Sequence, residues 1–176
     1  YSQQGAYFGA SIGRYANRIA KSRFTLEGKT YALTPSQGEN QLHGGTEGFD
    51  KRRWAISNQN DTEVLFTLTS DDGDQGFPGT LNASALYRLT EDNRIAIEYR
   101  ATVDKACPVN MTNHVYFNLN GEQSDVRSHK LQLLADAYLP VDEMGIPHDG
   151  LKDVTGTSFD FRQPKAISTD FLADGD

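Results

Sequence analysis

The chain has 176 residues and a formal net charge of −7, from 17 basic and 24 acidic residues. This acidic balance argues against a nucleic-acid partner, because nucleic-acid-binding proteins gather Lys and Arg on one face. No stretch reaches the about 18 consecutive apolar residues of a membrane span, and the single cysteine, Cys107, excludes a disulfide within the chain. We therefore expect a cytoplasmic protein, with no membrane or nucleic-acid partner, that binds a small neutral or weakly charged molecule.

The first part of the chain is expected to be rich in loops. Residues 5–20 mix small and polar side chains, and three glycines among the first thirteen residues favour a loop, although a short helical turn also fits the spacing. Residues 24–26 and 30–33 flank Gly28 and its polar neighbours, a pattern that predicts a hairpin. Residues 34–51 are then a long polar, glycine-rich loop.

Four later segments, 63–69, 80–90, 94–103 and 129–139, predict strands. Apolar and polar side chains alternate along them, as in antiparallel strands that bury one face. Residues 90–93 make the second and third of these strands a hairpin. The side chains expected on the buried faces of the second and third strands are Leu81, Ala83, Ala85, Tyr87 and Leu89, and Ile95, Ile97, Tyr99, Ala101 and Val103. In the fourth strand, Leu131, Leu133 and Ala135 are expected to share one face. No segment keeps a helical period over a dozen residues, so the predicted class is all-β, an antiparallel β-sandwich.

The run 108–119 carries one histidine, three asparagines and two aromatics in a strand-like stretch. Asn is depleted in strands because its side chain competes with backbone pairing, so this run predicts a polar pocket floored by a sheet. His114 is the group in the run best suited to move a proton near neutral pH. The alternative is a histidine that is only bonded to Asn113 or Asn118.

Two further clusters are candidates for ligand binding. His43 lies in a Leu-His-Gly-Gly loop, whose glycines either make only a turn or let the backbone approach a ligand while His43 donates a hydrogen bond to it. Asn17 lies between Arg14 and Arg18, which are four residues apart in a weakly polar stretch. Such an arginine is either a surface group that forms salt bridges or a buried group that needs a carboxylate or a ligand hydroxyl as its partner.

Metal or cofactor chemistry is not predicted. The four histidines show no metal-ligand spacing, and the loop 70–79 lacks the register of a calcium loop and is expected to be a rigid connection between strands. Cys107 stands beside a proline without neighbours that would stabilise a thiolate, so a nucleophilic role is not expected. These patterns by themselves indicate a protein that binds a small polar ligand and leave room for acid–base catalysis.

Five ordered motifs resemble those of the aldose 1-epimerases, or galactose mutarotases, of the bacterial type. The motifs are residues 9–19, 42–45 with 48–51, 74–79, 112–119 and 156–162. The resemblance implies an antiparallel β-sandwich of the galactose mutarotase type, here incomplete. Residues 1–176 would be part of one such domain, and we expect an internal fragment without the N-terminal strands and the C-terminal half of the family pattern.

The resemblance also implies a reaction, the interconversion of the α and β anomers of free aldohexoses such as galactose and glucose, without a metal or organic cofactor. It implies that His114 is the general acid that protonates the ring oxygen. It implies that His43, Asn17 and Arg18 bind sugar hydroxyls, with His43 also polarising the ring oxygen, and that Tyr116 belongs to the same sugar-contacting run. The asparagines around His114 are then sugar ligands or groups that orient it.

The sequence departs from the family pattern at the catalytic base. The family's base is a glutamate near the C-terminal end, and an aspartate in a Gly-Tyr-Asp-His-like segment binds the sugar, but neither segment occurs in this chain. Glu39, Glu47 and Glu122 lie in expected loops outside any such motif. We therefore expect a fragment that carries the acid and part of the sugar site and has little or no activity by itself.

Two other functions stay open. A hexose-6-phosphate epimerase of the same superfamily would need a basic cluster for the phosphate, and residues 51–53, Lys-Arg-Arg, are instead expected to begin a strand. A non-catalytic carbohydrate-binding β-sandwich would not need the His43 and His114 pair and usually presents a row of exposed aromatics. The single tryptophan, Trp54, argues against this second alternative.

Overall fold

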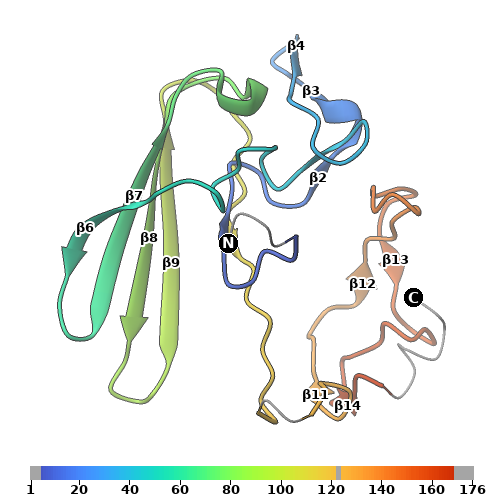
Figure 1. Cartoon of the computed structure of the whole chain (residues 1–176). Coiled ribbons are helices and arrows are strands. Elements are labelled where there is room, and N and C mark those ends of the chain that lie inside the picture. Colours follow the sequence, from blue (N-terminus) through green and yellow to red (C-terminus); the bar gives the residue numbers. More distant parts are fainter. Residues whose placement is uncertain (1–4, 122–123, 169–176) are drawn as a thin grey trace. The chain divides into compact units, whose positions relative to one another are not determined.

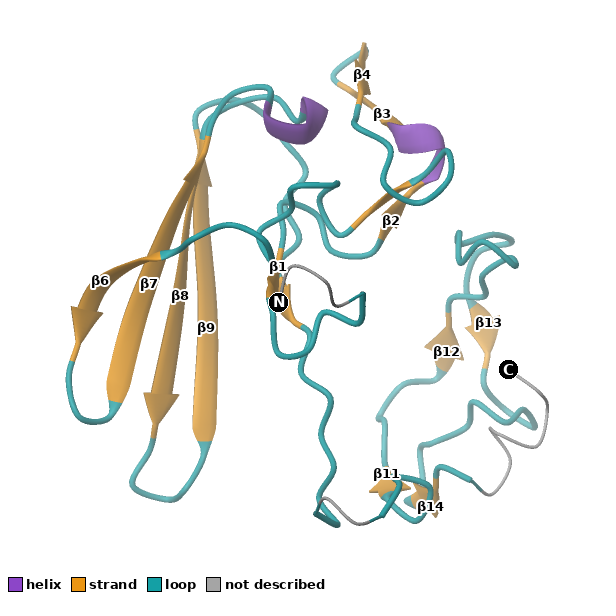
Figure 2. Ribbon diagram, viewed as in Figure 1, coloured by secondary structure: helices purple, strands orange, loops and turns teal. Residues whose placement is uncertain are grey.

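The computed structural model describes residues 5–121 and 124–168 of the chain. It divides into two compact units, Tyr1–Val115 and Tyr116–Asp176. All pairs of named strands are antiparallel, and the helical segments of the described ranges are two short 3-10 turns (Figures 1 and 2). None of the helices in this part of the chain is long and apolar enough to cross a membrane. That residues 1–176 belong to one domain stays a prediction.

A four-stranded sheet forms the largest element of the first unit (Figure 1, green strands). Its strands are β6 (Ala55–Gln59), β7 (Glu63–Ser70), β8 (Leu81–Leu89) and β9 (Ile95–Val103), in the order β6-β7-β8-β9. The three strands expected between residues 63 and 103 and the hairpin of β8 and β9 are confirmed. The expected strand start at residues 51–53 is wrong, because these residues form a turn and loop and β6 begins at Ala55.

The core of the first unit lies on one face of this sheet. Leu81, Ala83 and Ala85 of β8 are buried, as their alternation predicts, whereas Tyr87 is half-buried and Leu89 at the end of the same face is exposed. A cluster joins the buried residues Phe49, Leu68, Leu81 and Ala83 to Trp54 and Met111 at its rim.

The burial predicted for β9 is wrong over most of its length. Ile95 is 69% exposed and Val103 is 38% exposed, and Ala101 is exposed as well, whereas Ile97 and Tyr99 are half-buried. Alternation determines which side chains share a face, but burial requires a layer that covers this face. Within the described residues, β9 is an edge strand that pairs only with β8.

Short strand pairs place the remaining loops of the first unit. They are β1 (Ser11–Ile12) with β10 (Thr112–Asn113), β2 (Arg18–Ile19) with β5 (Gln41–Leu42), and β3 (Arg23–Leu26) with β4 (Lys29–Ala32), with 3-10 turns at η1 (Ala20–Ser22) and η2 (Asp74–Gly76). The hairpin predicted around Gly28 is confirmed, with φ of 50° at Glu27 and 76° at Gly28. Such positive φ values are those of the tight turns that match the twist of a two-stranded ribbon.

The strand-like run 108–119 contributes only the two residues of β10 to a sheet, so a longer strand is not found. The carboxamide oxygen of Asn113 accepts a hydrogen bond from the backbone N–H of Val115 at 3.0 Å. This local bond competes with continued strand pairing, and residues 114–118 lie outside any strand.

The second unit contains two short pairs, β11 (Lys130–Leu131) with β14 (Lys165–Ala166) and β12 (Ala137–Tyr138) with β13 (Lys152–Asp153). The single strand expected over 129–139 is wrong, because the segment between β11 and β12 is irregular. There the backbone N–H of Leu133 donates to the carbonyl of Phe161 at 2.8 Å, and the side chain of Gln132 donates to the carbonyl of Arg162. The shared face was predicted correctly, since Leu131, Leu133 and Ala135 line one apolar cavity of about 280 Å³.

Candidate functional site

The backbone of His114 is attached to a turn near the start of the chain. Its N–H donates to the carbonyl of Ala10 at 2.9 Å, and its carbonyl accepts from the N–H of Gly9 at 3.1 Å. The preceding residue, Asn113, pairs with Ser11 in the β1–β10 ladder. His114 is therefore held by a short antiparallel contact between segments about one hundred residues apart in sequence.

His43 is held by Asn17 through two hydrogen bonds. The backbone N–H of His43 donates to the carbonyl of Asn17 at 3.0 Å, and the backbone N–H of Asn17 donates to Nδ1 of His43 at 3.0 Å. Because Nδ1 accepts a hydrogen bond, the proton of the neutral ring lies on Nε2. His43 therefore carries one N–H donor, at Nε2, that its bond to Asn17 leaves available.

The two glycines after His43 bring protein segments together. A Cβ at Gly44, where φ is +86°, would lie 1.9 Å from the carbonyl oxygen of Gly13. A Cβ at Gly45 would lie 2.3 Å from the side-chain oxygen of Gln75. Both close approaches are to other parts of the chain, so the packing of this turn requires the two glycines, and the role of His43 as a hydrogen-bond donor to a ligand stays a prediction.

The imidazoles of His43 and His114 lie side by side at nearly a right angle. Their ring centroids are 5.2 Å apart, with an angle of 89° between the planes. The ring of Tyr7 contacts both, edge-on to His43 at 4.6 Å and stacked on His114 at 5.6 Å with an angle of 27°. No sequence pattern singles out Tyr7, which stands between Ala6 and Phe8 in a glycine-rich loop.

Burial sets the charge of this cluster at neutral pH. Burial is the largest cause that lowers the pKa of His43 from 6.5 to about 4, and the electrostatic effects of His114 and Arg18 act in the same direction. Burial also raises the pKa of the Tyr7 hydroxyl, with the charge of Asp50 adding to this effect and Arg18 opposing it. At neutral pH His43 is thus a neutral hydrogen-bond donor and Tyr7 a neutral phenol.

Asn17 and Arg18 lie next to His43 in the structure. Arg18 is half-buried and donates from Nε to the side-chain oxygen of Gln37 at 2.7 Å, and from a terminal nitrogen to that of Asn17 at 3.4 Å. No carboxylate within the described ranges forms an ion pair with Arg18. Its partners are neutral amides, which leaves the guanidinium charge uncompensated at this surface.

Arg14, in contrast, is a structural residue. It is 1% exposed, and its guanidinium donates to Ser70 Oγ at 2.8 Å and to the carbonyls of Ser70 and Pro78 at 2.9 and 3.0 Å. Further bonds reach the carbonyls of Asp71 and Gly79. Neither of the partners considered from sequence, a carboxylate or a ligand, is needed, because the backbone of the loop 70–79 supplies the acceptors.

The asparagines around His114 are bonded within the protein. Asn113 donates from its side chain to the hydroxyl of Tyr87 at 3.1 Å and to the carbonyl of Gly9 at 3.4 Å. Asn110 donates to the carbonyl of Ala16 at 3.4 Å. These contacts favour the second of the two expected roles for these amides, that of orienting the segment that carries His114.

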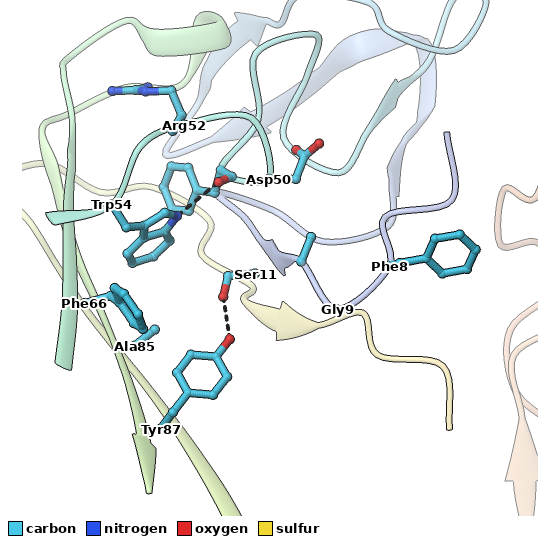
Figure 3. Close-up of a pocket in the computed structure, with 11 residues that line it drawn as sticks. Phe8, Gly9, Ser11, Asp50, Arg52, Trp54, Phe66, Ala85 and Tyr87 are labelled. Carbon is cyan, nitrogen blue, oxygen red and sulfur yellow. Dashed lines mark hydrogen bonds between the residues drawn. The ribbon is translucent and has the colours of Figure 1, made fainter. Parts of the chain in front are cut away.

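A cavity of about 380 Å³ lies beside β1, lined by residues that include Phe8, Ser11, Trp54 and Tyr87 (Figure 3). Figure 3 shows the hydroxyls of Ser11 and Tyr87 pointing toward each other, and they share a hydrogen bond of 3.0 Å. Neither imidazole lines this cavity. The candidate site is therefore the surface formed by the two imidazoles, Asn17 and Arg18, and not the cavity.

Tyr116 begins the second unit and is 57% exposed. Its expected place in the site stays a prediction, because it and the imidazoles belong to different units. Among the described residues no group of three or more His, Cys, Asp or Glu side chains has the arrangement of a metal site.

The fold and site together define an antiparallel β protein with two imidazoles at a polar surface. The family model for aldose 1-epimerase matches residues 1–175, and the chain therefore belongs to the aldose 1-epimerase family. The chain is 75% identical over 176 residues to the aldose 1-epimerase of Escherichia coli strain K12, covering 100% of this chain and 51% of that protein.

Two solved structures resemble this chain closely. An aldose epimerase homologue from C. elegans has a TM-score of 0.90 and 34% identity, covering 96% of this chain and 52% of that one. A galactose 1-epimerase from Lactobacillus acidophilus has a TM-score of 0.86 and 34% identity, covering 96% of this chain and 50% of that one. The predicted family and the antiparallel β-sandwich class are thus confirmed, and the chain spans about half the length of the curated relatives it matches.

Proposed function

We propose that this chain supplies the acid half of an aldose 1-epimerase site, which interconverts the α and β anomers of free aldohexoses such as galactose and glucose. The observation that carries this proposal is the right-angled pair of imidazoles, one of them kept neutral, at 5.2 Å beside Asn17 and Arg18. A neutral sugar needs hydrogen-bond donors and a proton donor, and this surface supplies both.

Anomerisation opens the sugar ring and closes it again. A base takes the proton of the anomeric hydroxyl, the bond between C1 and the ring oxygen breaks, and an acid delivers a proton to that oxygen. Rotation about the C1–C2 bond then presents the other face of the aldehyde, and closure reverses both proton transfers. A positioned acid of this kind contributes about 10²–10⁴-fold to the rate.

We assign the acid to His114 and the polarising donor to His43. His43 at neutral pH keeps a proton on Nε2 and has its other nitrogen bonded to Asn17. It can therefore donate to the ring oxygen as negative charge develops there, which is electrostatic stabilisation. Asn17 and Arg18 would bind hydroxyls, and Tyr116 is proposed as a further sugar contact. The glutamate that serves as the base in the family pattern has no matching motif in these residues.

A chimera tests this assignment. In the chimera, residues 1–176 replace the matching residues of the E. coli relative, whose own N-terminal and C-terminal parts are kept. The mutarotation of freshly dissolved α-D-galactose is followed by polarimetry. We expect the 176-residue chain to differ little from buffer and the chimera to accelerate the reaction. In the chimera, His114→Asn should reduce the rate by about 10²–10⁴-fold. A folded chimera with no activity, or one that His114→Asn leaves unchanged, would contradict the proposal.

The same assay separates the alternatives. A hexose-6-phosphate epimerase would prefer glucose 6-phosphate to galactose, but the basic residues available for a phosphate are partly occupied. Arg52 forms an ion pair with Asp74 at 2.7 Å, and Lys51 donates to the carbonyl of Thr46. A binding module would take up galactose without changing its rate of mutarotation. We also propose a cytoplasmic location, which fits a half-buried thiol at Cys107 that is in no disulfide.

A further inference from the structure

Tyr7 is the one aromatic residue in contact with both imidazoles among the described residues. Its ring centroid lies 4.6 Å from that of His43, edge-on at 76°, and 5.6 Å from that of His114, nearly parallel at 27°. The two histidine planes differ by 89°. A single ring therefore meets one imidazole with its edge and the other with its face, the two geometries that aromatic pairs prefer.

The backbone that carries Tyr7 also holds His114. The carbonyl of Tyr7 accepts from the N–H of Ala10 at 3.0 Å, which closes a turn over residues 7–10. The same turn exchanges hydrogen bonds with His114, from the N–H of Gly9 and to the carbonyl of Ala10. Tyr7 and His114 are thus both attached to this hydrogen-bonded turn, and His43 follows the end of β5.

We infer that Tyr7 is a positioning residue of this site, whose ring holds the two imidazoles at a right angle and keeps water from His43. Only the effect of Tyr7 on catalysis rests on the proposed function. The contact between the three rings stands whatever reaction the site performs.

The ring of Tyr7, and not its hydroxyl, carries this role. Among the described residues the hydroxyl of Tyr7 forms no hydrogen bond, whereas its ring contacts both imidazoles. The charged or titratable groups that face His43 are Arg18 from β2, His114 from the segment after β10, and Tyr7 itself. Both Arg18 and His114 disfavour the protonated, positively charged form of His43, and burial disfavours this form most.

Removing the ring should therefore let His43 take up a proton more easily. The imidazole C–H signals of His43 and His114 are followed by NMR in the 176-residue chain between pH 3 and 9. In Tyr7→Met, a flexible side chain of similar reach, the midpoint of His43 should rise from about 4 toward the ordinary value, by about one pH unit. Tyr7→Phe should leave the midpoint where it is.

Tyr31→Met is the matched control. Tyr31 stacks on Phe24 at 5.2 Å in the hairpin of β3 and β4 and touches neither histidine. It should leave both titrations unchanged. An unchanged His43 midpoint in Tyr7→Met overturns the inference, and so does an equal shift in Tyr7→Phe, because the hydroxyl would then be the active group.

A kinetic measurement tests whether Tyr7 also affects catalysis. In the chimera described above, Tyr7→Met should lower kcat more than it raises KM and should move the acid limb of the rate profile to higher pH, whereas Tyr7→Phe should do neither. A chimera without activity whose Tyr7→Met titration still shifts would reject the proposed function and leave the positioning role standing. Normal kinetics in Tyr7→Met would reject the positioning role in an active enzyme.

Discussion

Gly44 offers the sharpest test of how the site is built, because a single methyl group there meets a backbone. At φ +86° a Cβ would lie 1.9 Å from the carbonyl oxygen of Gly13 and 2.8 Å from the backbone nitrogen of Arg14. The left-handed conformation alone costs alanine about 1–2 kcal/mol. The two segments must also separate by about 1.5 Å to reach an ordinary contact, and forced overpacking of this kind costs about 1–3 kcal/mol. We therefore expect Gly44→Ala to lower the free energy of unfolding by about 2–5 kcal/mol.

Gly28→Ala is the control for the conformational part of this loss. Gly28 has a similar φ of +76°, and nothing lies within 4 Å of its Cβ position. It should cost only the about 1–2 kcal/mol of the left-handed backbone. Urea unfolding followed by the fluorescence of Trp54 reports on the unit that contains both glycines. Equal losses for the two variants would refute the argument that Gly44 is needed for the close approach to Gly13.

Three residues carry the remaining predictions. Arg14→Met leaves several buried carbonyls without a donor and should lower the free energy of unfolding in urea by about 4 kcal/mol. Arg94 is exposed, so Arg94→Met should change it by no more than about 0.5 kcal/mol. Similar losses for the two variants would contradict a structural role for Arg14. The pKa of His43 is about 4 in the folded chain, below the ordinary value of 6.5 that applies to the unfolded chain. As the pH falls, His43 is therefore protonated in the unfolded chain before it is protonated in the folded one. The contribution of His43 to the free energy of unfolding should be full above pH 6.5 and should be lost as the pH falls toward 4. Over this range the free energy of unfolding should fall by about 1 kcal/mol more than in His43→Gln, after allowance for the partial exposure of His43. Parallel pH curves for the two proteins would show that His43 is not the group responsible.

The elements that could be predicted from sequence are those with a local cause. The strands β7, β8 and β9 follow from side-chain alternation, and the β3–β4 hairpin follows from Gly28. What covers a strand is not a local property, and this is why the burial of Ile95 on β9 was predicted wrongly. The segment 129–139 shows the same limit, because its alternation gave the correct shared face and the wrong secondary structure.

For the site, residue types were easier to predict than roles. His43, Asn17 and Arg18 do meet in the structure, and His114 joins them through a ring contact with His43. Tyr7 could not be predicted from the sequence, because its place depends on a turn that forms hydrogen bonds with His114, more than one hundred residues later.

Arg14 and the glycine after His43 were ambiguous for a related reason. Their partners are backbone carbonyls, of Pro78 and other loop residues for Arg14 and of Gly13 for Gly44. Every residue type has a backbone carbonyl, so the sequence carries no record of which one is used.

Left-handed backbone recurs at this site in residues other than glycine. Tyr7, Asn17 and His43 have φ values of 56°, 68° and 52°. Each such residue costs about 1–3 kcal/mol, least for Asn, unless its surroundings impose the conformation. Glycine would relieve this strain but would remove the ring or amide. The surroundings that impose it are visible: the paired bonds between Asn17 and His43, the turn closed at Tyr7, and the Gly44 contact beneath them. The strain and the packing that balances it are therefore two parts of one arrangement, which fixes the imidazoles before a ligand arrives.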